Sequence, residues 1–152
     1  MFYGEYEHSL DNKDRLIIPA KFREIFQENY VEKFFITRGL DRCLFVFAEE
    51  EWKSQEQKFK NLSFTKEEAR KFNRLYFSGA QEVICDKQGR ILLPGYLKEY
   101  AEIRQDVVII GVSDRIEIWA KEKWKSFFEN NMGSFEELAE KLVDPKNQKE
   151  ER

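Results

Sequence analysis

The chain has 152 residues, of which 36% are charged and 15% aromatic, and its formal net charge at pH 7 is -3. This length suits one ordinary domain, or two small halves that share a core. A mean hydropathy of -0.69 and the lack of an apolar run long enough to cross a bilayer exclude an integral membrane protein. The start of the chain lacks the basic and then apolar segments of a signal peptide, which predicts a cytosolic protein.

A short stretch of the sequence occurs twice. Residues 11–19 read DNKDRLIIP and residues 86–94 read DKQGRILLP, so Asp, Arg and Pro recur in the same register. If each of these residue types makes up about 5% of a sequence, three such matches arise by chance in roughly one alignment in ten thousand. The similarity continues downstream, where Trp52-Lys53-Ser54 returns as Trp124-Lys125-Ser126. The sequence therefore predicts one fold built from two copies of a unit.

Both copies predict the same order of elements: strand, polar turn, strand, proline, short helix and then two more strands. In the first copy the strands are expected at residues 5–10, 15–18, 34–36 and 43–47. In the second copy they are expected at residues 81–85, 90–93, 107–110 and 116–119. We expect the first two strands of each copy to pair with each other as a hairpin across the polar turn.

Two of these strands carry further expectations. Residues 43–47 are all apolar, so this strand is expected to be covered on both faces, by another copy or another subunit. Glu117 alternates with Ile116 and Ile118, which predicts that this strand shows one face to water. Cys43 and Cys85 lie in or beside apolar runs and are expected to be small buried residues rather than disulfide or metal ligands.

A helical connector is predicted between the copies. Thr65 begins a capping-box pattern, with Glu68 three residues later, and is expected to open the second helix of the connector. Lys66, Arg70 and Arg74 follow one another at helical spacing. Such a stripe is more typical of a solvated or intersubunit face than of a nucleic acid contact.

The C-terminal part of the chain contains a second capping-box pattern, SFEE, beginning at Ser134. It predicts a final helix whose apolar residues point inward. These residues are Phe135, Leu138, Ala139 and Leu142. The charged residues that follow, 144–152, have nothing to bury, and we expect them to be disordered.

The residue types of an enzyme active site are scarce. His8 is the only histidine, so a Ser-His or Cys-His unit has no second candidate. The sequence holds no zinc-ligand spacing, no Gly-rich phosphate loop and no dinucleotide fingerprint. We therefore expect no enzyme activity, no cofactor, no metal and no small-molecule substrate.

The recurring Asp and Arg suggest a binding role. Across a tight turn, Asp11 lies close to Arg15, and Asp86 to Arg90, so each carboxylate is expected to brace its arginine through a bidentate bond. A braced arginine at a hairpin tip suits guanine O6 and N7 in the major groove, and Lys13 or Lys87 beside it suits phosphate. Both motif regions, residues 11–23 and 86–98, are locally basic within an acidic chain. From the residues alone, a purely structural turn explains the pairs equally well.

The tandem motifs resemble those of the MraZ family of bacterial transcriptional regulators. The resemblance rests on residues 11–23, 39–41, 43–44, 70–80, 86–94 and 111–119, together with Trp52. It implies an α+β fold, a double-split β-barrel of the swapped-hairpin SpoVT-AbrB type. Its parts would be repeats at residues 5–52 and 80–124, a helical connector at 53–79, and C-terminal helices with a tail at 125–152.

The resemblance also implies a function. Members of the family form ring-shaped homo-oligomers that bind direct repeats in promoter DNA of the division and cell wall gene cluster, including their own operon. The DNA-contacting residues would be Asp11, Arg15, Asp86 and Arg90, in a cytoplasmic protein associated with the nucleoid. An antitoxin-like or scaffold module that grips a protein partner is the alternative.

The first motif departs from the family pattern at Asp14, where the second copy has the glycine that the family favours, Gly89. We expect the carboxylate of Asp14 to compete with Asp11 for Arg15. The first motif would then bind DNA less well than the second, or prefer a different base.

Overall fold

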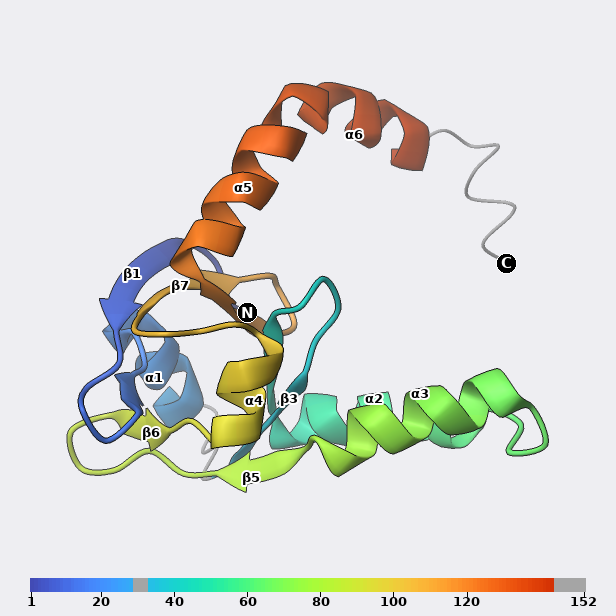
Figure 1. Cartoon of the computed structure of the whole chain (residues 1–152), viewed down its shortest axis with the longest axis horizontal. Helices are drawn as coiled ribbons and strands as arrows, with labels where there is room; N and C mark the ends of the chain where they lie inside the picture. The colour runs from blue at the N-terminus through green and yellow to red at the C-terminus, as the bar shows by residue number, and fades with distance from the viewer. Residues whose placement is uncertain (29–32, 144–152) are drawn as a thin grey trace. The chain divides into compact units, whose positions relative to one another are not determined.

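A computed structural model of the chain describes residues 1–28 and 33–143 and shows a mixed α+β fold (Figure 1). The strands are β1 (Glu5–Ser9), β2 (Arg15–Ile17), β3 (Phe34–Arg38), β4 (Leu44–Ala48), β5 (Gln81–Val83), β6 (Arg90–Leu92), β7 (Asp106–Gly111) and β8 (Ile116–Ala120). The helices are α1 (Ala20–Glu28), α2 (Glu49–Lys60), α3 (Glu67–Ser78), α4 (Gly95–Tyr100), α5 (Lys121–Asn131) and α6 (Phe135–Val143), with a 3-10 turn at Met132–Ser134. The chain divides into two compact units, residues 1–121 and 122–152.

The two copies exchange strands instead of forming separate hairpins. A six-stranded sheet has the order β1-β7-β8-β4-β3-β5, and β2 pairs with β6 in a separate two-stranded ribbon. The predicted hairpins of β1 with β2 and of β5 with β6 are therefore wrong. Strand β1 pairs with β7, β5 pairs with β3, and β2 pairs with β6, its counterpart in the other copy. Alternation fixes which face a strand buries but not which strand it joins. Because Leu16 lies opposite Ile91 and both are buried, the two copies bury equivalent side chains together.

The main core lies between the ribbon and the six-stranded sheet, and both copies contribute to it. The ribbon side supplies Leu16, Ile18, Ile91 and Leu93, each at most 2% exposed. Ile36, Ile109 and Ile118 face them from the sheet, and Phe22 and Leu97 close the core from α1 and α4. Neither copy encloses a core alone. This arrangement is the double-split β-barrel of swapped-hairpin type that the family resemblance implied.

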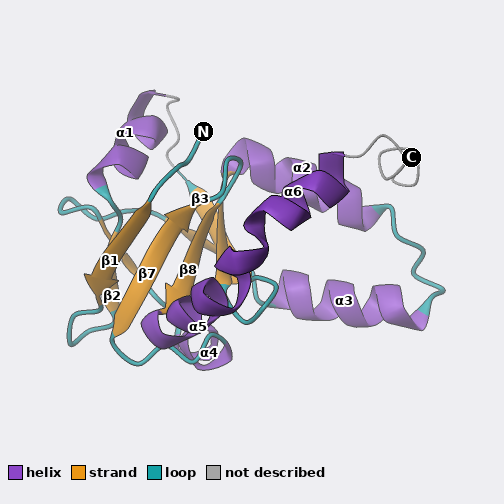
Figure 2. Cartoon of the chain, turned by 90° about the horizontal axis from the view of Figure 1, so that it is seen from above, coloured by secondary structure: helices purple, strands orange, loops and turns teal. Residues whose placement is uncertain are grey.

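One face of β4 lies in the main core with residues of the second copy, as expected. The other face is covered by the helical connector of the same chain, so for this face the expectation of another copy or subunit is wrong. Phe47 of β4 joins Trp52 of α2 and Tyr76 of α3 in a second aromatic cluster. The ring centroid of Trp52 lies 5.4 Å from the ring centroid of Phe35 and 5.7 Å from that of Tyr76. Figures 1 and 2 show α2 and α3 leaving the sheet side by side. The connector thus covers the strand that it leaves.

The start of α3 differs from the sequence-based expectation. The helix begins at Glu67 with Lys66 as its N-cap and without a side-chain capping bond, so the predicted capping role of Thr65 is wrong. The Thr65 hydroxyl instead lies 2.7 Å from that of Ser63. This local hydrogen bond competes with the cap.

Strand β8 is buried throughout, so the prediction that Glu117 faces water is wrong. The residue is 7% exposed. The carboxylate accepts hydrogen bonds from Nε of Arg115 at 2.9 Å and from Nε1 of Trp119 at 3.0 Å. These two donors make the buried position of the carboxylate acceptable.

The C-terminal unit also differs from expectation. Ser134 immediately precedes α6, as predicted, but the helix has no buried residue. Phe135 is 63% exposed and Leu142 65% exposed, so the prediction that they point inward is wrong. The apolar period of a helix marks a face but does not supply the surface that covers it. The predicted disorder of residues 144–152 concerns residues outside those that the structure describes.

Candidate nucleic-acid interface

The first Asp-Arg turn is built around one carboxylate. Oδ1 of Asp11 accepts the backbone N–H groups of Lys13 and Arg15, both at 2.9 Å. Its Oδ2 accepts Nε–H of Arg15 at 2.7 Å. The N–H of Asp14 donates to the carbonyl of Asp11 at 3.1 Å and closes the turn. An Asp side chain that mimics a backbone acceptor in this way fixes the turn and the arginine together.

The second turn repeats this arrangement. Oδ1 of Asp86 accepts the N–H groups of Gln88 and Arg90 at 2.9 Å, and Oδ2 accepts Nε–H of Arg90 at 2.8 Å. The predicted contact within each Asp-Arg pair is thus present in both turns, but its bidentate form is wrong. Each carboxylate uses one oxygen for the arginine and the other for the backbone. The guanidinium is therefore oriented through Nε, and its terminal nitrogens are not used in the bond to its own aspartate.

These hydrogen bonds keep both carboxylates ionised. The pKa of Asp11 is lowered to about 2, mainly by the N–H of Arg15 and also by the N–H of Lys13 and the Arg15 side chain, against a smaller opposing effect of desolvation. The pKa of Asp86 is lowered for the same reason, with the N–H of Arg90 as the main cause. At neutral pH each turn therefore holds a carboxylate against an arginine.

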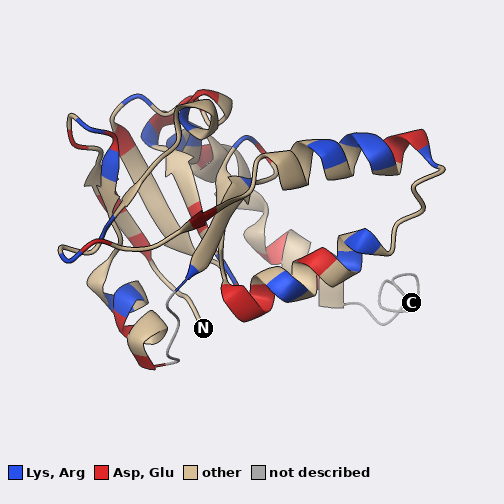
Figure 3. Cartoon of the chain, turned by 90° about the horizontal axis from the view of Figure 1, so that it is seen from below, with Lys and Arg blue, Asp and Glu red and all other residues tan. Residues whose placement is uncertain are grey.

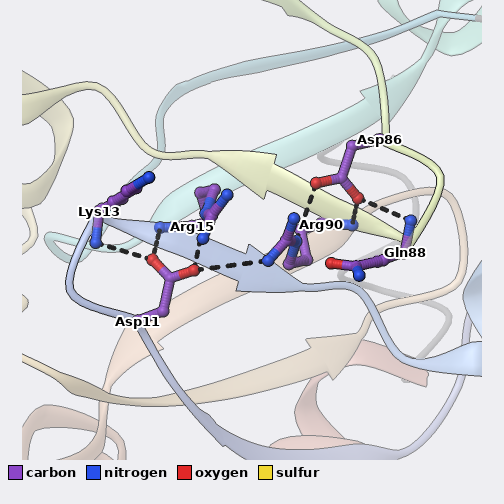
Figure 4. Close-up of polar contacts among 6 residues, drawn as sticks. All are labelled: Asp11, Lys13, Arg15, Asp86, Gln88 and Arg90. Carbon is purple, nitrogen blue, oxygen red and sulfur yellow. Dashed lines mark hydrogen bonds and ion pairs between the residues drawn. The ribbon is translucent and has the colours of Figure 1, made fainter.

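The ribbon brings the two turns into one site. In the antiparallel β2–β6 register, Arg15 lies opposite Leu92, and Arg90 lies opposite Ile17. The Nη1 atom of Arg90 lies 3.8 Å from Oδ2 of Asp11. Figure 4 shows the Asp11 carboxylate joined by dashed lines to both Arg15 and Arg90. The sequence predicted the individual pairs, but not that one aspartate contacts both arginines, because that contact depends on the strand exchange.

Backbone bonds across the copies hold the two turns in place. The N–H of Leu93 donates to the carbonyl of Asp14 at 2.9 Å, and the N–H of Ile18 donates to the carbonyl of Gly89 at 3.0 Å. Each turn is therefore fixed by the strand that precedes the other copy's helix. This reciprocal bracing makes the site a rigid unit rather than two loops.

The remaining candidate residues lie at the rim of the turns. Lys13 and Lys87 are exposed at the turn tips. The carboxylate of Asp14 lies 2.7 Å from Nζ of Lys98 on α4, so the expectation that it competes for Arg15 is wrong. Sequence reasoning missed Lys98 as a partner of the first turn. The signal was the repeat itself, because exchanged strands place the helix of one copy beside the turn of the other.

Other chemistry has little support in the described part of the chain. No group of three or more His, Cys, Asp or Glu side chains there is placed to hold a metal ion. Both cysteines are free thiols. Cys43 is buried, as predicted, whereas Cys85 is half-buried. No described helix is both long and apolar enough to cross a membrane. The basic stripe predicted on the connector belongs to α3, where Figure 3 shows Lys and Arg spaced along the helix. In this stripe, Arg70 donates a hydrogen bond to the carbonyl of Phe64 at 3.0 Å.

The fold and the site together define a class of protein: two interlocked swapped-hairpin repeats in one chain, each with an aspartate-braced arginine. The family model described as "MraZ protein, putative antitoxin-like" matches residues 1–75 and 76–146. The transcriptional regulator MraZ of Carboxydothermus hydrogenoformans is 52% identical over 144 residues, which cover 95% of this chain and 98% of that protein. The transcriptional regulator MraZ of Desulforamulus reducens is 51% identical over 144 residues, covering 95% and 99%. The chain belongs to the MraZ family, which confirms the family predicted from the paired motifs.

Proposed function

We propose that this chain is a transcriptional regulator that binds double-stranded DNA in a sequence-specific manner, with no enzymatic activity. The observation that carries the proposal is the position of Arg15 and Arg90 on one ribbon, both in contact with Asp11. The major groove accommodates a two-stranded ribbon. Relatives at about half identity over nearly the whole chain are named as transcriptional regulators.

The chemistry of the turns supports base recognition. Because Asp11 and Asp86 bind Nε of their arginines, the terminal nitrogens do not bond to their own aspartate and can donate to an acceptor pair. In Arg90, Nη1 also lies 3.8 Å from Oδ2 of Asp11. Guanine O6 and N7 form such a pair on one base edge. The ammonium groups of Lys13 and Lys87 at the turn tips would bind the flanking phosphates, which position the protein without reading sequence.

The mode of binding that we propose is avidity. Subunits of a ring-shaped homo-oligomer would each present one ribbon to successive direct repeats in promoter DNA of the division and cell wall cluster, including the chain's own operon. Linkage then converts individually weak contacts into tight binding without new contacts. We assign the repeats to residues 5–52 and 80–124, and place the protein in the cytoplasm at the nucleoid.

A protein-interaction module is the second candidate. The antitoxin-like description of the family and the exposed apolar side chains of α6 favour it. Such a module would grip a protein partner without recognising a DNA sequence.

A gel shift on DNA upstream of the chain's own gene tests the proposal. The purified protein should retard the full fragment, and deletion of single repeats should weaken binding stepwise. Equal retardation of a shuffled fragment of the same length would contradict sequence-specific binding. Failure to retard any fragment, even at low salt, would favour the protein-interaction module.

A further inference from the structure

The two turns differ in one position that takes the same backbone conformation in both. Asp14 has φ 58° and Gly89 has φ 79°, and this left-handed region is uncommon for residues other than glycine, asparagine and aspartate. The carbonyl of each residue accepts the same bond from the other copy. Because Gly89 forms its bond without a side chain, the turn does not require the carboxylate of Asp14.

The carboxylate of Asp14 makes a different contact. Its Oδ1 lies 2.7 Å from Nζ of Lys98, and the two side chains are 45% and 21% exposed. Lys98 is the counterpart of Arg23 in the repeat. Arg23 donates Nε–H to the carbonyl of Ile18 at 2.9 Å and lies against Gly89. Each turn therefore has a cation from the helix of the other copy beside it.

Only the first of these cations has a carboxylate beside it at this position of the turn, because the second turn has Gly89 there. A carboxylate at Gly89 would stand where the guanidinium of Arg23 lies, since an added Cβ would be 2.5 Å from its Nη1. At the first turn the charge of Asp14 cancels that of Lys98, so this turn carries one positive charge less than the second. This loss falls at the rim of the site, beside Lys13 and Arg15.

We propose that Asp14 attenuates DNA binding by the first turn, by holding the Lys98 ammonium that would otherwise bind a phosphate. This inference rests on the proposed function and concerns how the two motifs of one chain share the affinity. The short Asp14–Lys98 contact occupies the ammonium, and the half-exposed carboxylate adds a negative charge that phosphates avoid. The second turn has no such residue and therefore binds DNA more strongly than the first.

Asp14→Asn tests this inference, because asparagine tolerates the left-handed conformation and removes only the charge. Binding to a duplex of the upstream region is measured by fluorescence anisotropy from 0.1 M to 1 M salt. One additional phosphate contact steepens the slope of log K against log salt by about 0.9, or about eightfold in affinity between 1 M and 0.1 M salt. Asp14→Asn and Asp14→Gly should both show this change.

Two controls separate this effect from a general change of charge. In a Lys98→Gln background, Asp14→Asn should leave the salt slope unchanged, because the ammonium it releases is gone. Asp41→Asn, at φ 65° in the β3–β4 connection, removes the same charge away from the turns and should leave the slope as in the wild type. Thermal unfolding of each variant reports whether the fold is kept, and Asp14→Gly replaces Asp14→Asn if the latter unfolds.

The outcomes are distinct. A wild-type protein that binds with a steep salt slope, together with Asp14 variants of the same slope, would overturn the role of Asp14 and leave the proposed function standing. Weaker binding by both Asp14 variants would also overturn it. A wild-type protein without salt-dependent binding would overturn the proposed function and this inference together.

Discussion

Replacing Arg90 with alanine should weaken DNA binding and leave the fold intact. The Arg90 side chain is 24% exposed and contacts Asp86 at 2.8 Å and Asp11 at 3.8 Å. After truncation, Asp86 keeps its two backbone N–H donors and Asp11 keeps its bonds to Lys13 and Arg15. No carboxylate is left without hydrogen bonds, so we expect little change in stability.

The expected loss of affinity follows from the base contact. One bidentate contact between arginine and guanine contributes about 1–3 kcal/mol of discrimination, which corresponds to about 5- to 150-fold in Kd. Because Arg90 also contacts Asp11 of the first turn, its removal perturbs both turns. Arg15→Ala leaves the bonds within the second turn in place, so its loss of affinity should be equal to or smaller than that of Arg90→Ala.

Anisotropy titrations at one fixed salt concentration measure this effect, with Lys58→Ala on α2 as a control that removes the same charge outside the turns. Size-exclusion chromatography and thermal unfolding report the assembly and the fold. If Arg90→Ala dissociated the oligomer or lowered Tm strongly while the remaining folded protein bound DNA as the wild type does, Arg90 would be structural.

Three further predictions concern the same site and its core. Asp11→Asn should weaken binding more than Asp86→Asn, since only Asp11 contacts both arginines; equal losses in titration would show that the turns act independently. The folded-state pKa of Asp11 lies below its usual 3.8, at about 2, so its contribution to stability is complete above about pH 4 and lost as the pH falls toward 2. The difference in free energy of unfolding between wild type and Asp11→Asn, measured in urea, should therefore be constant from neutral pH down to about pH 4 and then shrink. A difference that stayed constant down to pH 2 would show that the lowered pKa of Asp11 does not contribute to stability. Leu16→Ala removes a side chain that is 0% exposed between the two copies and should lower the free energy of unfolding by about 2–5 kcal/mol; a loss under about 1 kcal/mol would mean that the ribbon is not part of the core.

Sequence reasoning succeeded where the interaction is local. Asp11 and Arg15 are four residues apart around a turn, so their contact follows from the motif, and the same holds for Asp86 and Arg90. The duplication also predicted the same order of elements in both copies, and the structure places Leu16 and Ile91 at equivalent buried positions. The family resemblance then supplied the swapped-hairpin class, which the residue pattern alone did not distinguish from two ordinary hairpins.

The features that were missed depend on which elements meet. An apolar strand predicts that both faces are covered, but the sequence does not show that α2 and α3 of the same chain cover β4. Glu117 fits the alternation of an exposed strand, and although its donors Arg115 and Trp119 lie two residues away on the same strand face, the sequence does not show that this face is buried. Lys98 is 84 residues away from Asp14 in sequence, so their contact follows only from the exchange of strands.

The central claim is that the paired turns bind DNA, and the salt dependence of binding tests it most directly. The affinity of the wild-type protein for the upstream duplex should fall steeply with salt, because each phosphate contact contributes about 0.9 to the slope of log K against log salt. Lys13→Ala and Lys87→Ala should each reduce that slope by about 0.9. A flat salt response of the wild type, or slopes unchanged by both lysine variants, would contradict this account.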